Sequence, residues 1–236
     1  FEASVAGGIP ILRTIKEGLA TNKINKVYGI LNGTCNYILT AMAHSGRDFQ
    51  DVLKEAQSLG YAEEDPSFDI DGIDTAHKLS ILACLAFGVE IDFEDIHIEG
   101  IRHISSIDIN FARELGFGIK LLGVATRSEN GIIIRVHPCM VPDDAPINHV
   151  NGVLNAVIVD GKPIGKNVIQ GEGAGPSATT SALISDISSI LRGNIKFPFA
   201  ISSLKRKKVS SGKISNLFFS SYIRLDVKDK YGVLSD

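Results

Sequence analysis

The stretch from Gly60 to Lys78, GYAEEDPSFDIDGIDTAHK, places six carboxylates directly before an apolar helical run, LSILACLAF. The acids at both ends of Asp71-x-x-Asp74 are typical of a helix entrance, with Asp71 as the N-cap and Asp74 as the acid at N3. In such a helix Asp74 and Lys78 share one face, with Cβ atoms about 5–6 Å apart. The sequence therefore predicts a carboxylate and an ammonium side by side at the mouth of a buried helix.

Two interpretations of this acidic stretch remain open from the residues alone. In the first, Asp71 and Asp74 only cap the helix, and the Asp74–Lys78 pair stabilises it by a few tenths of a kcal/mol. In the second, the pair belongs to a pocket that binds a small molecule bearing an ammonium group, with Lys78 as a proton donor. The second gains support from the other four acids of the stretch, because like charges at this density repel unless they are separated or used: Glu63, Glu64, Asp65 and Asp69.

A glycine loop, GEGAGP at 171–176, precedes a run of small residues that begins at Ser177. One interpretation is a flexible turn into a helix with Pro176 near its first position. The other is close backbone approach to a ligand, because residues without side chains at a helix N-terminus leave N–H groups free for a polar or anionic partner.

Composition limits the class of protein. The 236 residues, 44% hydrophobic and 22% charged, suit one sizeable core or one domain plus a fragment, and a net charge of −3 gives no reason to expect nucleic acid. Three cysteines without CxxC spacing favour a reducing, cytoplasmic location over a disulfide framework or a zinc site. Neither an 18-residue apolar run nor a leader is present, so no membrane segment is expected. The basic run KRKK at 205–208 could suggest nucleic acid but is better explained as a solvated linker.

Periodicity and turn residues predict an α+β fold with a mixed β-sheet covered by helices mainly on one face. The expected helices are 11–17, 36–43, 48–59, 74–87, 105–115 and 177–191. The expected strands are 27–31, 119–126, 132–137, 154–159, 162–164 and 167–170, with turns at Glu129-Asn130-Gly131 and Asp160-Gly161.

Several stretches in one order resemble the landmarks of the homoserine dehydrogenase family, and together they cover roughly residues 1 to 195. They are FEASVAGGIPIL at 1–12, GILNGTCNYILTAM at 29–42, LGYAEEDP with the acidic loop, and GEGAGPSATTSALISDI at 171–187. The resemblance implies NAD(P)-dependent interconversion of L-homoserine and L-aspartate 4-semialdehyde in threonine, methionine and isoleucine biosynthesis. It also implies a homodimer or homotetramer, paired through the strand-rich middle, 119–169. The alternative is a non-catalytic assembly or regulatory fragment of such an enzyme.

The same resemblance implies roles for individual residues. Lys78 is the expected proton donor, and Asp74 is expected to bind the reacting end of the substrate and to tune Lys78. Glu63 and Asp69 are expected to hold the substrate ammonium, and Thr34 is a further substrate contact. The neighbouring Cys35 stands where the family's NGTTN motif has threonine, so any hydroxyl contact there is in doubt.

Cofactor and ion sites also follow from the resemblance. Gly60, Gly173 and Gly175 are the expected NAD(P) contacts. A monovalent cation such as Na⁺ is expected between the Glu2 carboxylate and three main-chain carbonyls, those of Val5, Gly7 and Ile9. From the residues alone, this opening segment is only a strand-to-helix corner.

The expected organisation is a catalytic and dimerisation domain at 1–197, a linker at 198–216 and the start of an ACT-like regulatory domain at 217–236, where YIRLDV is strand-like. No strand followed by GxGxxG occurs in the chain, which opens on Phe1, so a Rossmann domain is expected to precede it. Ala178, Ala182 and Ser185 are expected to pack on that domain. The chain alone is therefore expected not to oxidise homoserine.

Overall fold

The computed structural model describes residues 1–128, 131–195, 197–209, 212 and 219–227. Its main sheet has the strand order β3-β5-β4-β1-β6-β7, in which β3 and β5 are parallel and the other neighbours antiparallel. The strands are β1 (Lys23–Ile30), β3 (His97–Ile98), β4 (Phe117–Ser128), β5 (Gly131–Pro142), β6 (Leu154–Lys162) and β7 (Gly165–Glu172). The predicted mixed sheet of an α+β fold is confirmed.

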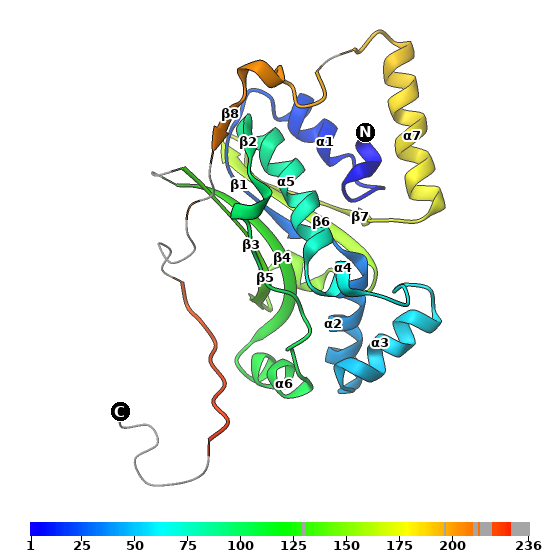
Figure 1. Ribbon diagram of the computed structural model, residues 1–236, viewed down its shortest axis with the longest axis vertical. Coiled ribbons are helices and arrows are strands. Elements are labelled where there is room, and N and C mark those ends of the chain that lie inside the picture. The colour runs from blue at the N-terminus through cyan, green and yellow to red at the C-terminus, as the bar shows by residue number, and fades with distance from the viewer. Residues whose placement is uncertain (129–130, 196, 210–211, 213–218, 228–236) are drawn as a thin grey trace.

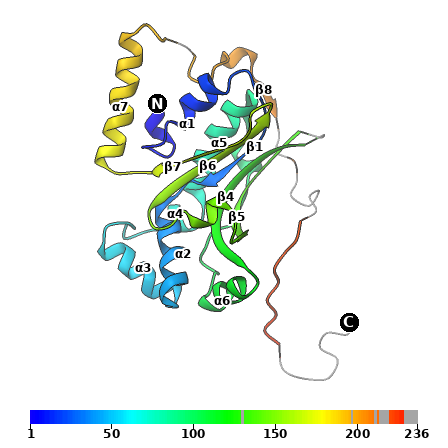
Figure 2. The ribbon, with the colours of Figure 1, turned by 180° about the vertical axis from the view of Figure 1, so that it is seen from behind.

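The helices lie mainly on one side of this sheet, as Figure 1 and the reverse view in Figure 2 show. They are α1 (Ile11–Arg13), which continues as a π-helical turn (Thr14–Gly18), α2 (Gly33–Ser45), α3 (Phe49–Ser58), α4 (Ser67–Ile70), α5 (Ile73–Phe87), α6 (Ser106–Glu114) and α7 (Pro176–Leu191). Short 3₁₀ turns occur at Glu2–Ser4, Phe93–Asp95, Pro146–His149 and Ser203–Lys205. In the described part of the chain, no helix combines the length and the apolar character needed to cross a bilayer.

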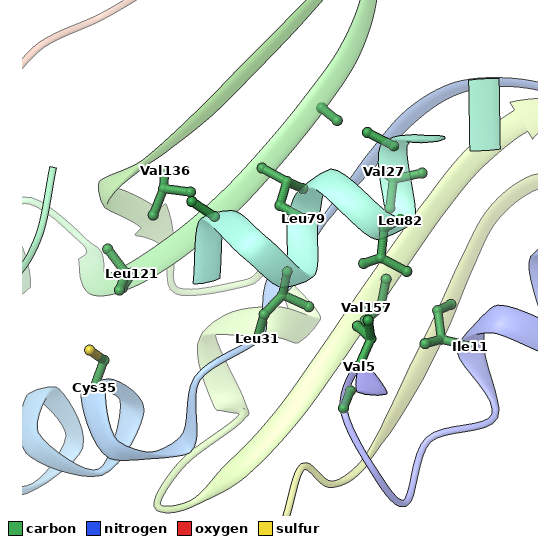
Figure 3. Packing of buried hydrophobic residues seen from close by; sticks show 14 of the residues in the cluster. Val5, Ile11, Val27, Leu31, Cys35, Leu79, Leu82, Leu121, Val136 and Val157 are labelled. Carbon is green, nitrogen blue, oxygen red and sulfur yellow. The ribbon is translucent and has the colours of Figure 1, made fainter. Parts of the chain in front are cut away.

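The main core lies between the sheet and α5, which crosses the sheet near its middle (Figure 3). Leu79 and Leu82 of α5 are fully buried, as are Val27 of β1 and Val157 of β6. Each such side chain contributes about 1.5–3 kcal/mol on burial. Gly88, in the left-handed region at φ +69°, ends α5, and its N–H bonds to the Cys84 carbonyl.

A smaller apolar cluster on the opposite face is formed by the strands themselves and the turn after β5. It contains Ile30, Leu122, Val124 and Ile158 from the sheet and Ile147 from the turn. Helices therefore cover mainly one face of the sheet, as predicted. On the other face, side chains of the strands pack against one another and against the turn after β5.

The prediction that Asp71 is the N-cap of the following helix is wrong. The acidic stretch contains the short helix α4, whose C-cap is Asp71, and the Asp71 carboxylate forms an ion pair with Arg102. Gly72, at φ +84°, is the N-cap of α5 and has no side chain to cap with, so Asp74 occupies the second helical position instead of N3. Asp74 and Lys78 nevertheless remain one turn apart on the same helix.

The predicted turn at Asp160-Gly161 is also wrong, because both residues are paired on each side within the sheet. Asp160 lies opposite Lys26 of β1 and Lys166 of β7, so β6 runs on to Lys162. The turn falls instead between Lys162 and Gly165, where Gly165 has φ +74°. For the first hairpin, Ser128 pairs with Gly131, while Glu129 and Asn130 lie outside the described residues.

The prediction that the small residues of α7 pack on another domain is wrong, because they contact other parts of this chain. Ala178 and Ala182 are buried within this chain, and a Cβ on Gly8 would lie 3.1 Å from the Ala178 Cβ. Ser185 accepts a hydrogen bond of 2.7 Å from Arg13. The apolar side chains exposed on α7 are others: Leu183, Ile184, Ile187, Ile190 and Leu191.

The structure describes only parts of the predicted linker and ACT-like start, which stay predictions. Within the basic run, Lys207 begins a strand, β8 (Lys207–Val209), which pairs in parallel with β2 (Val89–Ile91). Residues 222–227 carry no strand, since they are not paired to a neighbouring strand. Instead Tyr222 donates a hydrogen bond of 3.1 Å to Asp108 at the start of α6. The rest of that predicted domain, 217–218 and 228–236, lies outside the described residues.

Candidate active site

The start of α2 brings two parts of the acidic stretch together. Asn32 caps the helix by accepting a hydrogen bond of 2.8 Å from the Cys35 N–H. Its side-chain nitrogen donates to Asp69 over 2.7 Å and to Asp74 over 2.8 Å. The Thr34 hydroxyl lies 3.0 Å from the other oxygen of Asp69. The asparagine of the NGT turn therefore fixes two of the predicted substrate-binding carboxylates.

Lys78 and Asp74 form the predicted pair, with the ammonium 2.7 Å from the carboxylate. The Lys78 ammonium also lies 3.2 Å from the Leu31 carbonyl at the end of β1. The side chains of Lys78 and Asp74 are 23% and 18% exposed, so both are largely enclosed yet reachable. That position suits a group that must meet a small molecule as well as one that stabilises a helix.

A cavity of about 560 Å³ opens over this pair. It brings together most of the predicted substrate and cofactor residues, which are Thr34, Gly60, Asp69, Asp74, Lys78, Gly173 and Gly175. The remaining lining residues are Asn32, Gly33, Tyr61, Val153, Asn155, Glu172 and Ala174. Of these, Asn155 had a usable signal in the sequence, because it is a polar residue inside the apolar run of β6 and is buried.

The glycine loop forms one wall of the cavity. At Gly173 a Cβ would lie 2.3 Å from the Asn155 side chain, so only glycine fits against that amide. Gly175, the N-cap of α7, has φ +109°, and Gly60 has φ +74°. A Cβ at either Gly60 or Gly175 would meet nothing within 4 Å, so the absence of side chains there keeps space open and exposes backbone.

The four residues of the predicted cation site lie in a segment that contacts this loop. Gly7 and Gly8 donate main-chain hydrogen bonds of 2.8 and 2.9 Å to the carbonyls of Gly173 and Glu172. Glu2 is buried, and its carboxylate accepts hydrogen bonds from the backbone at the start of α1, including one of 2.8 Å from Leu12. Burial raises the pKa of Glu2 above its ordinary value, although these backbone donors oppose the shift.

Two predicted positions differ from the rest. Glu63 is exposed and is not among the residues that line the cavity; its carbonyl accepts a hydrogen bond of 3.1 Å from Gln57. Cys35 is fully buried below the cavity, and its thiol donates to the Asp69 carbonyl over 3.2 Å. Burial raises the pKa of the Cys35 thiol well above its usual range, so it remains a neutral donor.

Comparison with known proteins identifies the family. A sequence model described as homoserine dehydrogenase matches residues 10–188. Homoserine dehydrogenase of Pseudomonas aeruginosa is 46% identical over 243 residues, covering 100% of this chain and 56% of that protein.

Two solved structures of relatives share the fold. That of homoserine dehydrogenase from Thiobacillus denitrificans superposes with a TM-score of 0.83 at 45% identity, over 89% of this chain and 51% of that one. A hyperthermophilic archaeal homoserine dehydrogenase in complex with NADPH gives 0.69 at 30% identity, over 82% and 55%. The chain thus spans a little over half the length of these relatives, and it belongs to the homoserine dehydrogenase family.

Proposed function

We propose that the protein containing this chain interconverts L-homoserine and L-aspartate 4-semialdehyde with NAD(P). The observation that carries the proposal is the Asp74–Lys78 pair, 2.7 Å apart in the lining of a cavity that the glycine loop also lines. An ammonium in that place can supply the proton that a carbonyl oxygen needs as it becomes an alcohol. Membership of the family and the NADPH complex of the archaeal relative support the same reaction.

The cavity fits the nicotinamide end of the cofactor at the glycine loop. Gly60 and Gly175 leave open space where any other residue would place a Cβ, and Gly175 stands at the N-terminus of α7. When bound, the cofactor supplies or accepts the hydride. This chain contributes a stretch of backbone without side chains there, which allows the nicotinamide ring to approach the substrate.

Carboxylates near the pair are suited to the other end of the substrate. Asp69 lines the cavity and is held by Asn32 and Thr34, so its position is fixed before a ligand arrives. Glu63 lies on the exposed loop between α3 and α4, and it would add a second carboxylate if that loop closed over the substrate. Both would accept charge-assisted hydrogen bonds from the substrate ammonium.

We further propose that the Glu2 segment binds a monovalent cation such as Na⁺. Glu2 offers a buried carboxylate whose charge a cation would offset, and the carbonyls of Val5, Gly7 and Ile9 are hard oxygen donors within the following turns of chain. Because Gly7 bonds to Gly173, a bound ion would hold the glycine loop in place. Turnover in sodium buffer should then exceed turnover in choline buffer of equal ionic strength.

We also propose that two copies pair through the sheet, as a homodimer or a homotetramer built from such dimers. The support is the resemblance to a family that pairs its subunits through such a sheet, because the apolar cluster on the face opposite the helices, around Leu122, Val124 and Ile158, is already buried within one chain. Obligate interfaces commonly bury more than about 2,000 Å². A stable monomer in sedimentation at micromolar concentration would exclude this assembly.

The experiment for the reaction compares two samples with L-homoserine and either NAD⁺ or NADP⁺. The complete protein should form reduced nicotinamide, measured by absorbance, and residues 1–236 alone should not. No turnover by a folded complete protein with either cofactor would contradict the proposal. Steady turnover by residues 1–236 would contradict the proposal that a separate domain is needed to bind the nucleotide.

A further inference from the structure

A buried lysine contacts two segments that also contribute to the lining of the candidate active site. Lys120 of β4 is 5% exposed. Its ammonium donates to the Val150 carbonyl over 2.7 Å, to the Asn151 side-chain oxygen over 3.0 Å and to the Asn36 side-chain oxygen over 3.3 Å. An ammonium has three protons, so these three neutral oxygens use all of them.

These acceptors belong to two segments that Lys120 joins. Asn36 lies in the first turns of α2, and its side-chain nitrogen donates to the carbonyls of Val150 and Leu154 over 3.0 and 3.1 Å. The Gly152 N–H lies 3.2 Å from the Thr40 hydroxyl, one turn further along α2. The segment 150–155, which leads into β6, is therefore tied to α2 at several points, with the lysine as the only charged member of the set.

Both segments continue directly into the cavity wall. Val153 and Asn155 line it from one segment, and Asn32, Gly33 and Thr34 from the other. The two segments are in close contact there, since a Cβ on Gly33 would lie 2.9 Å from the Val153 carbonyl. A change in how Lys120 holds segment 150–155 would therefore reach Asn32, which orients Asp69 and Asp74.

We propose that Lys120 is a positioning residue for the reaction, whose ammonium clamps segment 150–155 to the start of α2 and so sets the geometry of the substrate cavity. The inference rests on the proposed function. It differs from a purely structural role because the clamp depends on a charged group, and burial lowers the pKa of Lys120 to about 8. The clamp then loses its charge within the range in which an enzyme of this kind can be assayed.

The polar groups around Lys120 favour the clamp over a second binding site. A second hollow, which shares no lining residue with the candidate active site, is lined by Lys120 together with His44, Arg113 and Asp143. Arg113 donates hydrogen bonds to the Asn110 side chain of α6 and to the Ala43 carbonyl. Asp143 accepts a hydrogen bond from Asn148. The three protons of the Lys120 ammonium are also donated within the chain. The charged groups of Lys120, Arg113 and Asp143 are therefore hydrogen-bonded to the protein itself.

The first test is Lys120→Met in the complete enzyme, which preserves length and apolar bulk while removing the ammonium. We expect kcat/KM for homoserine to fall about 10-fold or more, while the dissociation constant of the cofactor, measured by fluorescence, changes less than about 2-fold. Lys26→Met is the matched control. It replaces a half-buried lysine on β1 that contacts Tyr28 rather than segment 150–155, and it should keep normal kinetics.

The second test is Asn151→Asp, which places a carboxylate against the ammonium. A carboxylate at this distance raises the pKa of a lysine, because the opposite charge favours the ammonium form. The alkaline loss of homoserine affinity in the parent enzyme should therefore move to higher pH in this variant, and Lys120→Met should lack that component of the profile. This readout remains available even if the methionine variant folds poorly.

The outcomes separate the two proposals. If the unmodified enzyme does not turn over homoserine, the proposed function fails. If it does, unchanged homoserine kinetics in Lys120→Met would overturn the positioning role. So would a pH profile that is the same in Asn151→Asp as in the parent, even if Lys120→Met lowers activity, because that pattern belongs to a merely structural lysine.

Discussion

The carboxylates of Asp69 and Asp74 share one donor, the side-chain amide of Asn32, at 2.7 and 2.8 Å. Two acids held this close would repel each other, and the shared amide stabilises both in one arrangement. The same oxygen of Asp74 that accepts from Asn32 also accepts from Lys78. Asn32 is therefore the residue that connects the acids proposed to bind the substrate to the proposed proton donor, Lys78.

Asn32→Asp tests this connection with almost no change in shape. Aspartate caps a helix as well as asparagine does, so the free energy of unfolding should change little through loss of the cap. The donor is lost, however, and a third carboxylate is placed against Asp69 and Asp74. We expect kcat/KM for homoserine to fall about 10- to 100-fold, measured by initial rates. Normal kinetics would show that the shared amide does not organise the site.

The two acids assigned to the substrate ammonium should differ in effect. Asp69→Asn should raise KM for homoserine by about 10-fold or more, because Asp69 lines the cavity and is already oriented. Glu63→Ala should raise the same KM less, because Glu63 lies outside the lining and must first be brought in. The cofactor KM should be nearly unchanged in both variants. A larger effect at Glu63 would mean that loop closure contributes more than the fixed wall does.

Gly175→Ala should affect the cofactor more than the amino acid. The backbone at Gly175 has φ +109°, which an alanine adopts only with strain, and the added methyl group would enter the open side of the cavity. We expect KM for NAD(P) to rise several-fold or kcat to fall, with initial rates measured against each substrate in turn. Ser177→Ala, two residues further into α7 and exposed, is the control.

The pattern of the acidic stretch predicted the pairing of Asp74 with Lys78, because helical spacing fixes which residues share a face. The predicted N-cap at Asp71 failed because Asp71 pairs with Arg102, which is distant in sequence. The Asp160-Gly161 turn failed for a similar reason, since pairing with strands on both sides outweighed the local preference of the dipeptide. The roles of Asn36 and Lys120 could not be predicted from the sequence, because they exist only once β4, α2 and segment 150–155 meet.

Titration of Lys120 should also make the free energy of unfolding depend on pH. Its pKa is about 8 in the folded protein against an ordinary value of 10.5, so between these values the unfolded chain holds a proton that the folded chain does not. Raising the pH through this window therefore favours the folded state, by up to about 3 kcal/mol for a shift of this size.

Denaturant unfolding of the parent and of Lys120→Met at several pH values checks this sign. The stability of the parent relative to the variant should increase from pH 8 toward 10.5, because methionine does not titrate. Lys166→Met, at an exposed lysine of β7, should follow the parent at every pH. Parallel curves for the parent and Lys120→Met would show that the lysine titrates as it does in water.

The most direct measurement of the central claim is the kcat of Lys78→Ala in the complete enzyme, with thermal stability measured on the same samples. If Lys78 supplies the proton, kcat for homoserine should fall roughly 10²-fold or more, the scale of general acid–base catalysis, while Tm changes little, since an i,i+4 pair contributes only a few tenths of a kcal/mol. A variant with near-normal kcat and a lowered Tm would contradict the account and leave Lys78 as a structural partner of Asp74.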